Sequence, residues 1–223
     1  MIPYGRQKIS QEDIKAVNKV LKSDFLTQGE AVPAFEESIK SYCNVKNAVA
    51  VNSATSGLHL ACLSLGVGPE DEVWTSPISF VASANCALYC GASIDFIDID
   101  PFTYNISIES LKNKLEKAKE IGRLPKVIIP VHLAGQSCEM LSIFELSKIY
   151  NFKIIEDASH CIGGEYLEKK IGSCEFSDLC IFSFHPVKII TTGEGGMVTT
   201  NDESISRKLM RLRTHGITKN SDE

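Results

Sequence analysis

Lys188, beside a glycine-rich loop, is the residue of this sequence best suited to covalent chemistry. It ends the segment FSFHPVK, and the loop TTGEGG follows at residues 191–196. An amine beside a flexible loop after a buried strand can reach an aldehyde carbon and, once released, can shuttle a proton. Most lysines are solvated surface cations, so this interpretation depends on the neighbours of Lys188.

Acidic and imidazole side chains follow two other apolar runs. In IIEDASH, residues 154–160, Asp157 could pair with a protonated pyridine nitrogen and hold its ring as an electron sink, or it could cap the next turn. His160 could contact a cofactor or could be a structural, hydrogen-bonded histidine. His132, in PVHLAGQ, could line a substrate cleft or fix a turn.

Hydroxyl groups follow a further strand in the segment NSATSG, residues 52–57. Backbone N–H groups and the helix dipole at such a strand-to-helix junction form a phosphate site, to which Thr55 and Ser56 could add hydrogen bonds. The alternative is a simple Ser/Thr N-cap. Phe80, in SPISF after the next strand, could lie flat against a planar cofactor, although a single aromatic residue belongs more often to a core.

These segments together supply a phosphate cradle, a stacking ring, an acid for a pyridine nitrogen and an amine. Pyridoxal phosphate needs this set of groups. The sequence contains neither GxGxxG nor GxxxxGK[ST], so the common nucleotide motifs offer no competing cofactor. Cysteines and histidines show no zinc spacing, and no metal site is predicted.

Alternating strands and helices must position these segments. Strands are predicted at residues 48–51, 72–75, 94–97, 127–131, 154–156, 179–184 and 196–200. Helices are predicted at residues 11–23, 56–65, 81–89, 107–121, 142–150 and 202–214, with a short one ending near residue 42. The alternation predicts an α/β fold with a mainly parallel, mixed sheet and helices on both faces. Parallel strands bring their carboxyl ends to one edge, where the functional segments meet.

The composition is that of an ordinary globular protein, with 43% hydrophobic residues, 23% charged residues and a net charge of -5. The basic residues at 207–213 have the spacing of a solvated helix face, so no nucleic-acid partner is expected. The eight cysteines are expected to be reduced and mostly buried. Neither a signal peptide nor a membrane span is recognisable, which predicts a cytoplasmic protein without a membrane partner.

The sequence resembles the nucleotide-sugar aminotransferases of the DegT/StrS family, which are fold-type-I pyridoxal-phosphate enzymes. The motifs NSATSGLHLA, EDASHCIGG, FSFHPVK and TTGEGGMVTT match in order over essentially the whole chain. The resemblance implies that Lys188 holds the cofactor as a Schiff base, that Asp157 binds its pyridine nitrogen and that Phe80 stacks on its ring.

The same resemblance implies that Thr55, Ser56 and Ser183 hold the cofactor phosphate. His160 occupies the position where the family has a histidine or glutamine near the cofactor hydroxyl. Family dehydratases carry histidine in place of the lysine, so Lys188 favours aminotransfer. Outside enzymes, the alternative is a non-catalytic cofactor-binding or regulatory protein of the same fold.

Within the family, the segments IPYGRQKIS, LKSDFLTQG and EVWTSPISFVASANCALYCGA are most similar to members that serve pseudaminic-acid biosynthesis. The similarity implies transfer of an amino group from L-glutamate to C4 of a UDP-linked 4-keto-6-deoxy-N-acetylhexosamine, a nucleotide sugar used for surface polysaccharides.

Residues 1–30 are expected to form an N-terminal arm and helix, and residues 31–223 the cofactor-binding large domain. Family members are longer, end in a smaller C-terminal domain and work as homodimers in which a partner loop reaches the phosphate. We therefore expect the small domain to be missing from this chain, and the 223 residues alone to have little or no activity.

Overall fold

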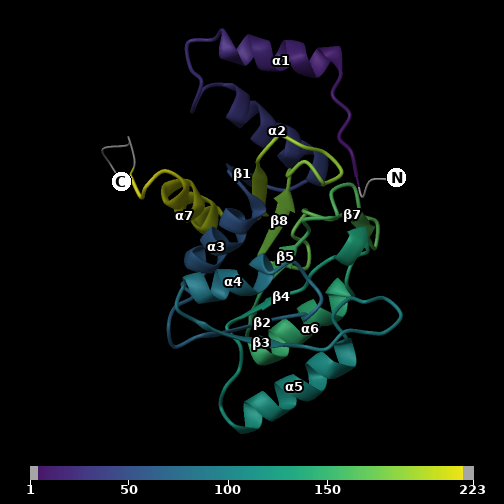
Figure 1. The fold of residues 1–223 in the computed structure, drawn as a ribbon. Coiled ribbons are helices and arrows are strands. Elements are labelled where there is room, and N and C mark those ends of the chain that lie inside the picture. Colours follow the sequence, from purple (N-terminus) through teal and green to yellow (C-terminus); the bar gives the residue numbers. More distant parts are fainter. Residues whose placement is uncertain (1–4, 218–223) are drawn as a thin grey trace.

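The structure, a computed structural model, describes residues 5–217 and is drawn in Figure 1. Residues 1–4 of the expected arm and the polar end at 218–223 lie outside the described residues. The strands are β1 (Asn47–Val51), β2 (Glu72–Thr75), β3 (Ser93–Phe96), β4 (Val127–Ile129), β5 (Lys153–Asp157), β6 (Glu165–Tyr166), β7 (Lys169–Lys170), β8 (Leu179–Ser183) and β9 (Gly196–Thr200). The helices are α1 (Gln11–Leu21), α2 (Ala31–Cys43), α3 (Ala54–Ser64), α4 (Ala82–Tyr89), α5 (Ile108–Glu120), the short 3-10 helix η1 (Leu133–Gly135), α6 (Met140–Tyr150) and α7 (Glu203–Arg213).

A seven-stranded sheet in the order β1-β9-β8-β5-β4-β2-β3 forms the centre of the described residues. The pairs β2–β3, β2–β4, β4–β5 and β5–β8 are parallel, whereas β9 runs antiparallel to both of its neighbours, β1 and β8. The prediction of a mainly parallel, mixed sheet is therefore confirmed. Strand β5 lies in the middle, so the residues at its carboxyl end are covered on both sides by neighbouring strand ends.

Helices cover both faces of this sheet (Figure 1). On one face α3, α4 and α7 pack on β-strand side chains such as Val49, Ile155 and Ile181. On the other face α5 and α6 bury Trp74 and Ile154, and α2 with the β6–β7 hairpin closes a third cluster around Phe182 and Met197. Alternate residues of each strand thus enter different clusters, as the pleat of a strand requires.

The element predictions are confirmed in type and order, with shifts of a few residues at their ends. Helix α3 begins at Ala54 rather than residue 56, because the N-cap is Ser53. Strand β4 ends at Ile129, before Pro130, which has no N–H to donate to a ladder. The β6–β7 hairpin was not predicted, since each strand has two residues and carries no readable period.

Helix α1 begins with a capping box: Ser10 Oγ accepts from the Asp13 amide, and Asp13 Oδ2 accepts from the Ser10 amide. No residue of α1 is buried in the described structure, and its apolar residues Ile14, Val17 and Leu21 are exposed. Figure 1 shows α1 above α2, away from the sheet. Residues of the expected arm and helix therefore add little to the core.

The cysteine prediction is confirmed, because all eight cysteines lie in the described residues as free thiols and all but Cys90 are buried. Burial raises the pKa of the Cys43 thiol to about 11 and that of Cys174 to about 12, which keeps both protonated. Among residues 5–217, no helix is both long enough and apolar enough to cross a membrane.

Gly196, the first residue of β9, allows this antiparallel strand to approach the start of α3. A Cβ atom at this position would lie 2.6 Å from the carbonyl carbon of Ser53 and 2.7 Å from the amide nitrogen of Ala54. These are backbone atoms of the helix N-terminus and cannot rotate away. The absence of a side chain at Gly196 thus allows β9 and α3 to lie this close together.

We expect Gly196→Ala to reduce the free energy of unfolding by about 1–3 kcal/mol, the usual cost of inserting a methyl group into a packed site. Gly68→Ala is the matched control, because a Cβ there has nothing within 4 Å; it should change stability by less than about 1 kcal/mol. Urea unfolding of both variants measures the difference. Equal stability of the two variants would contradict the close approach.

Candidate active site

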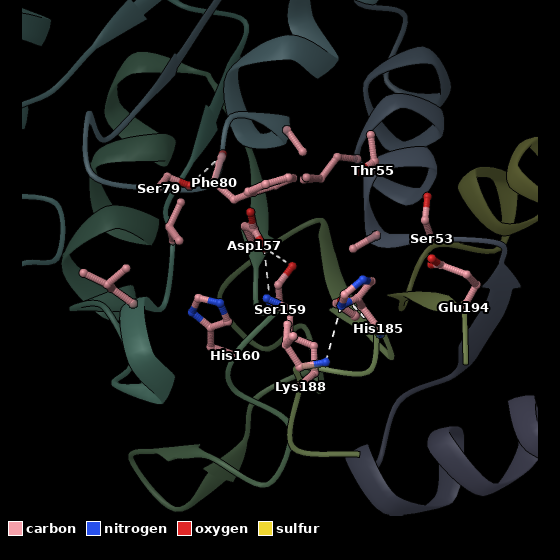
Figure 2. A pocket seen from close by; sticks show the side chains of 18 of the residues that line it. Ser53, Thr55, Ser79, Phe80, Asp157, Ser159, His160, His185, Lys188 and Glu194 are labelled. Carbon is pink, nitrogen blue, oxygen red and sulfur yellow. Dashed lines mark hydrogen bonds between the residues drawn. The ribbon is translucent and has the colours of Figure 1, made fainter. Parts of the chain in front are cut away.

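A cavity of about 620 Å³ opens at the carboxyl ends of the strands, where the sequence predicted it (Figure 2). It is lined by the N-cap and first turns of α3, by the segment between β2 and the start of α4, by residues after β4, by the end of β5 and the residues that follow it, and by the end of β8 with the loop after it. Its lining residues are Ser53, Ala54, Thr55, Leu58, Ile78, Ser79, Phe80, Ala82, Val131, Leu133, Asp157, Ser159, His160, Ser183, His185, Val187, Lys188, Glu194 and Gly195.

Asp157 ends β5 and is 3% exposed, yet its carboxylate lines the cavity. Ser83 Oγ donates to Oδ2 over 2.6 Å. The Ser159 amide and hydroxyl donate to Oδ1 over 3.1 Å and 2.6 Å. A buried carboxylate needs such donors, and together they fix its orientation.

Lys188 lies in the loop after β8 and is half-buried at the cavity wall. Its amide donates to the carbonyl oxygen of His185 over 2.9 Å, which closes a tight turn beneath the side chain. Burial lowers the pKa of the Lys188 amine, and the negative charge of Asp157 opposes part of that shift. The amine is therefore more easily deprotonated than that of a solvated lysine.

The first turn of α3 forms another wall, with Ser53 as N-cap. Ser53 Oγ accepts from the Ser56 amide over 3.1 Å, so the predicted N-cap exists and Ser53 supplies it. Thr55 and Ser183 line the cavity, whereas Ser56 is outside its lining and lies 3.1 Å, Oγ to Oγ, from Ser53. The remaining N–H groups of a first helical turn have no partner within the helix and attract anions.

Phe80 and His160 both line the cavity, and Figure 2 shows them with Asp157 in one group. Phe80 is 69% exposed, so its ring is available to a planar ligand. His160 Nδ1 accepts from the Ala134 amide over 3.4 Å. Burial lowers the pKa of His160, and the positive charge of Lys188 lowers it further against the attraction of Asp157. A neutral His160 with its proton on Nε2 fits this arrangement.

His132 does not line the cavity, and its role is that of a turn-fixing residue. The ring is fully buried; its Nδ1 accepts from the Cys138 amide over 3.1 Å and its Nε2 lies 2.7 Å from Glu156 Oε2. Because Nδ1 accepts a hydrogen bond, the ring proton is on Nε2 and is donated to Glu156. Ser177 Oγ donates to the other oxygen of Glu156.

Sequence reasoning missed several residues of the site. Ser83 is the sharpest case, because a serine inside a predicted helix gives no sign that its hydroxyl reaches a strand 74 positions later. Ser159, His185 and Glu194 stand inside the singled-out motifs but had no assigned role. Ser53 could have been found by its N-cap position, one residue before α3 begins.

The cavity fits pyridoxal phosphate on the chemistry of its side chains. It combines an amine of lowered pKa, a buried carboxylate 3% exposed, an open aromatic ring and a hydroxyl-lined helix N-terminus. Among residues 5–217, no group of three or more His, Cys, Asp or Glu side chains could hold a metal ion. The cavity's charged groups instead suit a ligand that carries an aldehyde, a basic ring nitrogen and a phosphate.

Comparison with solved structures shows that the chain has the large-domain fold of the fold-type-I pyridoxal-phosphate aminotransferases. Helicobacter pylori PseC, an aminotransferase of pseudaminic-acid biosynthesis, superposes with a TM-score of 0.88 at 38% identity over 99% of this chain and 58% of its own. Spr1654 of Streptococcus pneumoniae, solved in its PLP form, gives 0.86 at 29% identity over 99% of this chain and 59% of its own.

The chain belongs to the DegT/DnrJ/EryC1/StrS aminotransferase family, whose profile matches residues 7–223. The UDP-4-amino-4,6-dideoxy-N-acetyl-beta-L-altrosamine transaminase of Campylobacter jejuni is 48% identical over 220 residues, which are 98% of this chain and 56% of that protein. The chain therefore spans about half the length of the curated relatives it matches.

The lowered pKa of Lys188 predicts how its reactivity depends on pH. Trinitrobenzenesulfonate attacks only neutral amines, so labelling of Lys188 should rise at a pH below the 10.5 of an ordinary lysine. In Asp157→Asn the attraction that holds the proton is removed, and the midpoint should fall further. Peptide mass spectrometry across a pH series measures both midpoints; a Lys188 midpoint at or above 10.5 would contradict the burial argument.

Proposed function

We propose that the enzyme containing these residues is a pyridoxal-phosphate-dependent nucleotide-sugar aminotransferase. It moves the amino group of L-glutamate, in two half-reactions, to C4 of a UDP-linked 4-keto-6-deoxy-N-acetylhexosamine. The observation that carries the proposal is one cavity containing the Lys188 amine, the Asp157 carboxylate and the N-terminus of α3. The family match supports the reaction class.

Lys188 and Asp157 have the two catalytic roles in this proposal. When bound, pyridoxal phosphate supplies an aldehyde that reacts with amines and a ring that withdraws electrons from the carbon being deprotonated. The Lys188 Nζ is the group that anchors the cofactor and then moves the proton to and from that carbon. Asp157 keeps a proton on the ring nitrogen, which is the charge that makes the ring an electron sink.

Other cavity residues bind and orient the cofactor. The α3 N-terminus, with the hydroxyls of Thr55 and Ser183, receives the phosphate, and Ser56 supports this site through its bonds to Ser53. Phe80 stacks on the ring. His160 donates from Nε2 toward the cofactor hydroxyl, since its Nδ1 is already an acceptor.

The substrate proposal derives from the relatives. The Campylobacter jejuni relative acts, by its name, on a UDP-linked 4-amino-4,6-dideoxy-N-acetyl sugar, and the Helicobacter pylori structure is an aminotransferase of pseudaminic-acid biosynthesis. We also propose that the whole protein is a cytoplasmic homodimer. Exposed apolar side chains at and beside the cavity, such as Val81 and Ile189, are consistent with a covering partner subunit.

The anchoring role of Lys188 can be tested without turnover. We expect borohydride reduction of the protein incubated with pyridoxal phosphate to add a stable cofactor mass to the peptide that contains Lys188. Lys188→Arg should abolish the tag, because a guanidinium is not a nucleophilic amine. Lys112→Arg, at an exposed position of α5, is the matched control and should retain the tag. A tag on another lysine would remove Lys188 from the proposal.

The reaction itself can be tested with a protein of the relatives' length that contains residues 1–223. Given L-glutamate and the UDP-linked 4-keto-6-deoxy-N-acetylhexosamine, it should form the 4-amino sugar and 2-oxoglutarate, both detected by mass spectrometry. The same sugar linked to GDP is the control that tests whether the protein recognises the nucleotide. Absence of aminated sugar would refute the substrate, and residues 1–223 alone should give at least tenfold less product, because a nucleotide sugar needs more of the cleft than they supply.

A further inference from the structure

The Asp157 carboxylate is held by two serines that come from different elements. Ser83, in α4, is fully buried and donates its hydroxyl proton to Oδ2 over 2.6 Å. Ser159, two residues after Asp157, donates its amide and hydroxyl protons to Oδ1 over 3.1 Å and 2.6 Å. We call Ser83 and Ser159 the Asp157 clamp.

The clamp leaves the two carboxylate oxygens unequal. A carboxylate offers about four lone-pair positions, two on each oxygen. In the described structure Oδ1 accepts two hydrogen bonds and is fully used, whereas Oδ2 accepts one, from Ser83. Oδ2 is therefore the oxygen that has room for a further N–H donor. The hydrogen bond from Ser83 determines the direction in which Oδ2 points.

Ser83 also connects Asp157 to the segment that carries the Phe80 ring. Its amide donates to the Phe80 carbonyl oxygen over 3.1 Å, and its hydroxyl lies 2.6 Å from that of Ser79. Because an ionised carboxylate only accepts, the single hydroxyl proton of Ser83 goes to Asp157 and the Ser79 hydroxyl must donate to Ser83. Ser83 thus joins the Asp157 carboxylate to the backbone that carries the Phe80 ring.

We propose that Ser83, with Ser159, is a positioning residue that holds Asp157 Oδ2 in the orientation in which it would accept a hydrogen bond from the ring nitrogen of the cofactor. This inference rests on the proposed function, and Ser83 acts only through Asp157. Its removal leaves Oδ2 without its serine donor, so that the carboxylate is held only by Ser159 at Oδ1 and can turn about that anchor or take a water as a substitute donor. The ring nitrogen then loses an aligned acceptor.

Two measurements on the cofactor-loaded protein test this role. Ser83→Ala should weaken pyridoxal phosphate binding about tenfold in equilibrium dialysis, a factor that corresponds to 1.4 kcal/mol. It should also move the pH midpoint of the bound-cofactor absorbance upward. A protonated ring nitrogen disfavours a second positive charge on the nitrogen of Lys188. When the ring nitrogen holds its proton less firmly, the Lys188 nitrogen keeps its own proton to a higher pH, and the midpoint rises.

A double-mutant cycle separates this role from a general loss of packing. In the Asp157→Asn background, Ser83→Ala should change neither the dissociation constant nor the absorbance midpoint by more than about twofold or a few tenths of a pH unit. Ser64→Ala is the matched control, because Ser64 is a buried helix serine whose hydroxyl donates to the Ala61 carbonyl of its own helix. It should bind the cofactor as the unsubstituted protein does.

The half-buried Ser159→Ala repeats the test if Ser83→Ala fails to fold, and it should shift both quantities in the same directions. Unchanged binding and midpoint in the serine variants, or equal effects with and without Asp157, would overturn the clamp while leaving the proposed function intact. If the unsubstituted protein takes up no pyridoxal phosphate, the proposed function falls and the clamp with it.

Discussion

The burial of two adjacent carboxylates at the end of β5 constrains the whole functional edge of the sheet. The pleat of the strand turns Glu156 and Asp157 to opposite faces, and each is less than 5% exposed. Buried carboxylates are tolerated only where donors surround them. Glu156 receives His132 and Ser177 on one face, while Asp157 receives Ser83 and Ser159 on the other.

This pair of networks ties the loops of the edge to the central strand. His132 also accepts from the Cys138 amide, which fixes the turn after β4, and that turn presents the Ala134 amide to His160. The wall of the cavity near His160 is therefore supported by the buried hydrogen bond between His132 and Glu156 on the other face of the sheet. Lys188 lies in the loop after β8, the strand next to β5. Burial lowers the pKa of its amine, and the negative charge of Asp157 opposes part of that shift.

Most of the fold followed from the sequence. Runs of β-branched residues alternating with helical stretches gave the parallel strands and their helices, because each element must bury one face and the periods of strand and helix differ. The position of β9 did not follow. A strand of five residues carries no sign of direction, and only its packing between β1 and β8, with Gly196 against the start of α3, makes it antiparallel.

By itself the sequence determined which chemical groups are present and at which strand ends they stand, since Lys188, Asp157, Phe80 and the NSATSG segment each follow an apolar run. The tertiary structure alone decided which of them share the cavity. Thr55 and His160 line the cavity, whereas Ser56 and His132 do not. The packing also brought Ser83 to Asp157. Motifs specify local backbone, whereas a side chain's neighbours depend on how strands far apart in sequence pack together.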